Sequence, residues 1–268
     1  MRRLLQIEWI KLKSYKPFWI LSGLYFLGLF VILLGGKFFL LWMESKGAQF
    51  EGIKPSMLPI YDFDDIWHNM TYMASLLKVI PAFIFLILIT NEYSYKTLRQ
   101  NIIDGMTRAE FLYSKLLLAF IYSLVSMTFI FISGLIIGLF YSPVTELESI
   151  FGRADFLLAH GLEMFAFFSF TLLLSIVIRR TGFALVLLLI YAIMLEPILA
   201  LYIGYNYDGP ETFFPIKSIN LLVENPFTKY LLMETQVHVK TTSVLIALGW
   251  TLIFNVASYQ ILRKRDLL

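Results

Sequence analysis

Long apolar runs alternate with polar segments along the whole chain. Each run holds about 20 or more mostly apolar residues, the length that an α-helix needs to cross the roughly 30 Å hydrocarbon core of a bilayer. The pattern predicts six membrane-spanning helices, at about 18–41, 70–90, 115–140, 156–178, 182–204 and 241–262. We therefore expect an all-α membrane protein with one transmembrane domain over residues 1–268.

Residues 1–17 mix basic and apolar positions, unlike the run that follows them. Leu5, Trp9 and Leu12 fall on one side of a helix, and most of the basic residues lie off that row. This arrangement is typical of a helix that lies in the plane of the membrane interface. We expect an amphipathic interfacial helix before the first span.

Composition agrees with a membrane protein and narrows its chemistry. Of 268 residues, 59% are hydrophobic and 15% are charged, whereas about 25% of the residues of a soluble domain are charged. The chain has no cysteine and only three, widely separated histidines, so disulfides and thiolate metal sites are excluded. No set of catalytic residue types converges. We expect neither an enzyme, nor a metal site, nor a nucleic-acid partner.

Charge is distributed unequally between the two sides of the predicted membrane. The segments on one side hold 14 of the 22 Lys and Arg and five acidic residues, and they are 1–17, 91–115, 179–181 and 263–268. The remainder holds 8 basic and 14 acidic residues, so one side is near +9 and the other near −6. Cytoplasmic segments carry the excess of Lys and Arg. We expect both termini in the cytoplasm.

Two longer loops lie on the external side in this topology, at about 43–69 and 205–240. The second loop is expected to form two short helices, around 215–224 and 226–235, before the sixth span.

The connection between the second and third spans is longer than a simple turn requires. Residues 91–104 contain good helix formers, and Gly105 stands where a helix end favours a positive φ. Thr107 and Glu110 then have the spacing of a capping box that starts a new helix. We expect a helix, a sharp turn and a second helix. This element would either lie on anionic lipid or dock on a protein partner.

The residues of this connection resemble the coupling helix of ABC type 2 permeases, the membrane subunits of type V ABC exporters. They are Glu92, Tyr93, Thr97, Leu98, Arg99, Asp104, Gly105 and Arg108, followed by Lys115. The resemblance extends over the whole chain: a basic pre-helix, six spans, two external helices before the sixth span, and two cytoplasmic ends.

The resemblance implies a mechanism and partners. Two permease copies, identical or related, pair in the bacterial cytoplasmic membrane, surrounded by membrane lipids. Each coupling helix rests on a cytoplasmic ABC ATPase, which closes on ATP and Mg²⁺. The chain has no G-x(4)-G-K-[ST] motif, so we expect no cofactor bound to it directly. The family exports lipids, glycans, peptides, drugs and ions. The alternative is an ATP-independent membrane carrier or membrane assembly scaffold.

Three charged residues fall inside predicted spans, where a charge is costly and marks a candidate functional site. Lys78, Glu163 and Glu196 each lie about 20 Å from the basic end of their span, at 1.5 Å per residue. We expect Lys78 to pair with one of the two glutamates, in an outer gate or external vestibule. Otherwise the lysine would snorkel outward and both glutamates would lie in wet crevices.

A small-residue pair lies in the third span. Gly134 and Gly138 are spaced to allow another helix to approach closely, either within the chain or in a second copy.

Overall fold

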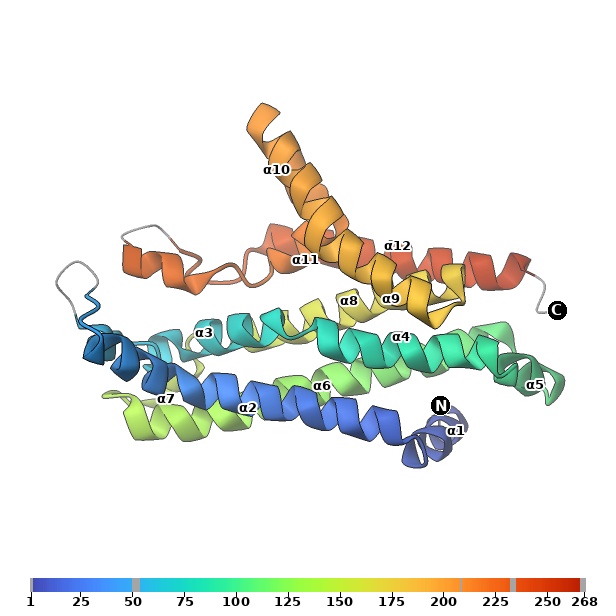
Figure 1. Cartoon of the computed structure of the whole chain (residues 1–268), viewed down its shortest axis with the longest axis horizontal. Coiled ribbons are helices and arrows are strands. Elements are labelled where there is room, and N and C mark those ends of the chain that lie inside the picture. Colours follow the sequence, from blue (N-terminus) through green and yellow to red (C-terminus); the bar gives the residue numbers. More distant parts are fainter. Residues whose placement is uncertain (1, 50–53, 208, 232–234, 266–268) are drawn as a thin grey trace.

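The computed structural model describes residues 2–49, 54–207, 209–231 and 235–265, and the secondary structure in these ranges is entirely helical. Most of the long helices run side by side along the long axis of the molecule (Figure 1). The elements that make up the predicted spans are α2 (Lys16–Ser45), α3 (Phe63–Leu76), α4 (Val79–Ser94), α6 (Arg108–Tyr141), α8 (Asp155–Ile178), α9 (Thr181–Leu189), η2 (Ile190–Leu195), α10 (Glu196–Asn206) and α12 (Thr241–Lys264).

Shorter helices lie in the segments that precede and connect these elements. They are α1 (Arg2–Lys13), η1 (Pro55–Met57), α5 (Thr97–Ile103), α7 (Leu147–Phe151), η3 (Pro210–Phe213), α11 (Pro215–Asn220) and η4 (Pro226–Leu231). The last three lie within the predicted loop 205–240. The second short helix expected there, around 226–235, extends into residues 232–234, which lie outside the described residues.

Five helical segments of the described residues are long and apolar enough to cross a membrane, and the bent pair α3–α4 makes six if it counts as one span. Each predicted span falls within one of these segments. The chain is therefore an all-α, multi-pass membrane protein.

The pair α3–α4 is bent by 46°, and Pro81 explains the position of the bend. Pro81 lies in the first turn of α4 and has no N–H to donate to the carbonyl of Leu77. The helix therefore restarts after Leu77 and Lys78. Upstream, α3 begins at Phe63, earlier than the expected start near residue 70, and the first-turn carboxylates of Asp64 and Asp65 favour that helix start.

The fifth span contains a π-helical segment, η2, between α9 and α10. Pro197, in the first turn of α10, lacks the N–H that would bond to the carbonyl of Ile193, and wide turns of this kind accompany such interruptions. Figure 1 shows α10 leaving the bundle at an angle. Its apolar side chains are largely exposed, with Leu201 at 73% and Tyr205 at 91%.

Two glycines let α3 approach α6 closely. A Cβ atom at Gly134 would overlap the ring of Trp67, and one at Gly138 would overlap the ring of Phe63. Both rings are buried. The structure thus places α3 of the same chain against the small-residue pair.

We expect Gly138→Ala to destabilise the bundle, because the buried Phe63 ring has to move. Overpacking of this kind costs about 1–3 kcal/mol. Gly23→Ala in α2 is the matched control, since nothing lies within 4 Å of its added Cβ. Thermal unfolding in detergent should show a lower midpoint for Gly138→Ala only. Equal midpoints for the two variants would contradict the close α3–α6 contact.

Candidate functional site

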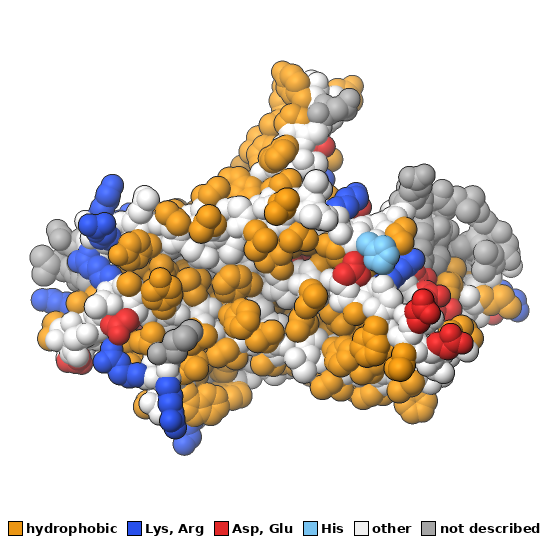
Figure 2. Space-filling view, turned by 180° about the vertical axis from the view of Figure 1, so that it is seen from behind, with side chains coloured by type: hydrophobic (Ala, Val, Ile, Leu, Met, Phe, Trp, Pro, Cys, Tyr) orange, Lys and Arg blue, Asp and Glu red, His pale blue; other side chains and the backbone are white. Residues whose placement is uncertain are grey.

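The described surface is divided by charge. On the face shown in Figure 2, most Lys and Arg side chains lie at one end of the molecule, most Asp and Glu side chains lie toward the other, and apolar side chains cover much of the region between them. The N-terminus, α1, α5 and the C-terminal end all lie at the basic end (Figure 1). The predicted docking element is therefore located where most of the positive charge is.

The expected single helix over 91–104 is divided in two. The helix α4 ends at Ser94, Lys96 has a left-handed φ of 58°, and α5 begins at Thr97. The Thr97 hydroxyl donates to the Glu92 side chain at 2.5 Å, and such local side-chain bonds compete with continuation of a helix. The prediction of one unbroken helix over this range is wrong.

The turn and the second helix follow the sequence pattern. Gly105 has a φ of 94°. Thr107 and Glu110 form a full capping box, with the Thr107 N–H 2.8 Å from Glu110 Oε2 and the Glu110 N–H 3.1 Å from Thr107 Oγ1. Together they fix where α5 ends and where α6 begins.

The residues expected to dock on an ATPase do not share one exposed surface. Four of them are exposed, namely Thr97, Arg99, Asp104 and Gly105. Leu98 lies on the buried side of α5, and Glu92 is 5% exposed. Tyr93 and Arg108 are half-buried, and Arg108 Nη1 donates to the carbonyls of Leu262 and Arg263 at 2.7 and 2.6 Å, which holds the end of α12.

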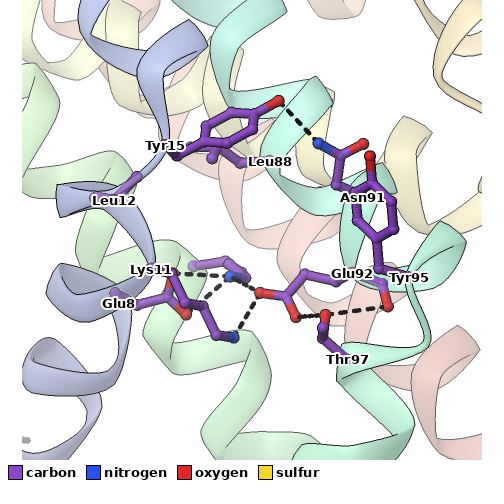
Figure 3. A pocket seen from close by; sticks show the side chains of 10 residues that line it. Glu8, Lys11, Leu12, Tyr15, Leu88, Asn91, Glu92, Tyr95 and Thr97 are labelled. Carbon is purple, nitrogen blue, oxygen red and sulfur yellow. Dashed lines mark hydrogen bonds and ion pairs between the residues drawn. The ribbon is translucent and has the colours of Figure 1, made fainter.

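Glu92 belongs to a group of four charges, the charge quartet, formed by the buried Glu8, Glu92 and Lys115 and the half-buried Lys11 (Figure 3). Lys115 Nζ lies 2.8 Å from both carboxylate oxygens of Glu8 and 2.9 Å from Glu92 Oε1. Lys11 Nζ lies 2.6 Å from the same Glu92 oxygen. Two cations and two carboxylates make the quartet neutral.

The quartet connects three helices, and a hydrogen bond extends it to a fourth. Glu8 and Lys11 come from α1, Glu92 from α4 and Lys115 from α6, and the Thr97 hydroxyl extends the network to α5. A cavity of about 150 Å³ adjoins it between α1 and α4 (Figure 3). The network therefore ties the interfacial helix to the docking element.

The sequence assigned Glu92 and Lys115 to the connection but did not predict that they are buried together. A signal was present, because Glu8 and Glu92 are isolated acids in strongly basic segments.

A second buried cluster lies around the α3–α4 bend. Lys78 Nζ donates to Glu163 Oε1 and to Asn220 Oδ1, each at 2.5 Å. Ser75 also donates to Glu163, and Glu163 is 1% exposed. Nδ1 of His160 lies 3.7 Å from Glu163. Of the two glutamates weighed for Lys78, the structure pairs it with Glu163.

Glu196 lies apart from this ion pair. Its Oε1 accepts the Lys217 N–H at 2.6 Å. Because Lys217 and Asn220 both belong to α11, Glu196 and Lys78 hold the same short helix from two sides. Two charged residues of the predicted spans, Lys78 and Glu196, thus both bond to α11. Among the described residues, no group of three or more His, Asp or Glu side chains is arranged to hold a metal ion.

Loss of the Lys115 charge should destabilise the protein strongly. Lys115→Met leaves Glu8 and Glu92 buried with less compensation, and breaking a buried pair costs about 3–5 kcal/mol. Arg3→Met is the matched control, because the Arg3–Glu110 pair is 65% and 35% exposed and such exposed pairs contribute little to stability. Thermal unfolding should separate the two variants. Similar losses in both would refute a stabilising quartet.

Reversing the Lys78–Glu163 pair should restore what each single reversal removes. Lys78→Glu and Glu163→Lys each place two like charges in contact and should reduce accumulation of the protein in membranes. The double variant recovers opposite charges at the same contact. Lys78→Glu with Glu196→Lys is the control and should not recover, because Glu196 contacts α11 instead. Recovery only in that control would contradict the assigned pair.

Comparison with known proteins agrees with this architecture. Residues 3–267 match the family model described as ABC-2 family transporter protein. No curated protein is similar enough to count as a relative. Because the match covers nearly the whole chain, the chain belongs to the ABC-2 family of transporter proteins, as a multi-pass membrane permease.

Proposed function

We propose that the chain is the membrane subunit of an ATP-driven ABC exporter and that α5 receives the movement of a separate cytoplasmic ATPase. The observation that carries the proposal is the charge quartet, which connects the exposed α5 to the membrane helices. Ile103 at the end of α5 is 67% exposed, so its side chain is available for contact with a partner.

The helix α4 supplies a route from the docking element into the membrane. It carries Glu92 of the quartet near one end and is preceded by Lys78 of the second cluster at the other. Its 16 residues span about 24 Å. A force on α5 moves Glu92, and because α4 is an unbroken helix the displacement reaches the Lys78–Glu163 pair and α11. In this mechanism the pair and α11 act as the outer gate.

Orientation follows from charge. The basic end with both termini faces the cytoplasm, in accordance with the excess of Lys and Arg. ATP and Mg²⁺ bind to the ATPase, and this chain carries no nucleotide-binding motif. A second permease copy, identical or related, covers the exposed apolar face of α10. The complex resides in the bacterial cytoplasmic membrane and exports its substrate.

The test is retention of the ATPase after purification from the native host. Wild-type protein should co-purify with a subunit that carries G-x(4)-G-K-[ST], identified by mass spectrometry. Ile103→Glu should lose it, because a charge replaces an exposed apolar side chain of α5. Lys264→Glu, at an exposed position on the same end, should retain it.

Retention of the ATPase by Ile103→Glu would move the docking surface away from α5. Absence of an ATPase from every sample would favour the ATP-independent carrier or scaffold.

A further inference from the structure

A cavity of about 410 Å³ lies on the other side of Glu92 from the quartet. It opens between the last turn of α4, the start of α5 and the junction of α8 with α9. Four cationic residues line it: Lys96, Arg99, Arg179 and Arg180. Tyr93, Leu98 and Ile178 provide its apolar lining.

Among the described residues, no acidic side chain balances the positive charge of the cavity. The carboxylate in its lining is Glu92, and both oxygens of Glu92 are already bonded, one to Lys11 and Lys115 and the other to Thr97. In the described part of the chain, no carboxylate pairs with any of the four lining cations. Several cations around one hollow repel each other, so an anion bound there would be stabilised.

Arg179 is placed to provide directed hydrogen bonds. Its guanidinium carbon lies 5.1 Å from the centre of the Tyr93 ring, within the range of a cation–π contact. Its Nε is buried and has no hydrogen-bond partner among the described atoms. A planar guanidinium with free donors matches the geometry of a phosphate group.

Two lining residues also have a costly backbone conformation. Lys96 and Arg179 both have a φ of 58°, and they are the described non-glycine residues with a positive φ. Long side chains are disfavoured in that region, and strain of this kind is concentrated at ligand sites and switches. Here the two strained residues line one cavity from two different junctions, Lys96 between α4 and α5 and Arg179 between α8 and α9.

From this cluster we infer that the cavity binds the phosphate group of an anionic membrane lipid. The inference rests on the proposed function for its orientation, which puts the cavity at the cytoplasmic leaflet, where anionic lipids attract basic segments. The apolar residues beside the cations suit the glycerol and upper acyl region of a lipid better than a free anion. A bound headgroup would bridge the α4–α5 and α8–α9 junctions and stiffen the docking element.

The test measures lipid binding directly on the full-length complex with its co-purified ATPase. Native mass spectrometry follows titration with phosphatidylglycerol, with phosphatidylcholine, or with phosphatidylglycerol in excess inorganic phosphate. The test variant is Lys96→Asn with Arg179→Asn, because asparagine is neutral and tolerates a left-handed φ. The control is Arg263→Asn with Lys264→Asn, two exposed cations on the same end.

Phosphatidylglycerol should bind the wild type more tightly than phosphatidylcholine, and inorganic phosphate should not displace it. The test variant should bind it roughly 30-fold more weakly, as expected from the loss of two surface cations, with no fall in melting temperature. The control should keep wild-type affinity.

Wild-type affinity in the test variant would overturn the proposal. Loss of the ATPase with unchanged lipid binding would also overturn it and would assign the cavity to protein docking. Displacement by inorganic phosphate would overturn the lipid as the source of the anion. Lipid binding that persists where no ATPase is found would keep this site and reject the exporter function instead.

Discussion

The ammonium group of Lys115 lies between two carboxylates in a nearly dry environment, and the basic end of the molecule depends on it. Lys115 is 1% exposed, and its partners Glu8 and Glu92 are each 5% exposed. Removing one partner at such a position leaves a largely buried charge without compensation, which is far more costly than at the surface. The four helices that meet there consequently have to move together.

The same constraint gives α4 its role. A helix embedded among apolar neighbours can slide or rotate with little resistance, but α4 has a buried ion pair at each end. Glu92 fixes one end to α1 and α6, and Lys78 fixes the other to α8 and α11. Pro81 separates α4 from α3, so α4 can tilt without carrying α3 along. With a buried ion pair at each end and the α3–α4 bend next to Lys78, α4 is suited to transmit a displacement from one end to the other.

The apolar runs predicted the spans well because the length of a crossing helix is set by the bilayer and not by tertiary contacts. Which charged side chains pair with one another is harder to predict from the sequence. Lys115 and Glu8 are 107 residues apart, and nothing local indicates that α1 folds back over α6. For Lys78, the sequence offers two glutamates at a similar depth in the predicted membrane. Which of them faces the lysine depends on how each helix is rotated about its axis, and packing sets that rotation. The break at Lys96 was missed because it depends on the Thr97–Glu92 bond, and neither residue is a usual helix breaker.

Glu92 separates two neighbouring sites of opposite character. On one side it completes a quartet whose charges cancel, and a neutral, fully bonded cluster has no capacity left for a ligand. On the other side it faces four cations to which it offers no free oxygen. Had Glu92 been free, the cavity would be partly neutralised and would attract anions less. The bonds that hold Glu92 in the quartet therefore leave it no free oxygen for the cations of the adjacent cavity, and one carboxylate belongs both to the quartet and to the lining of the proposed binding site.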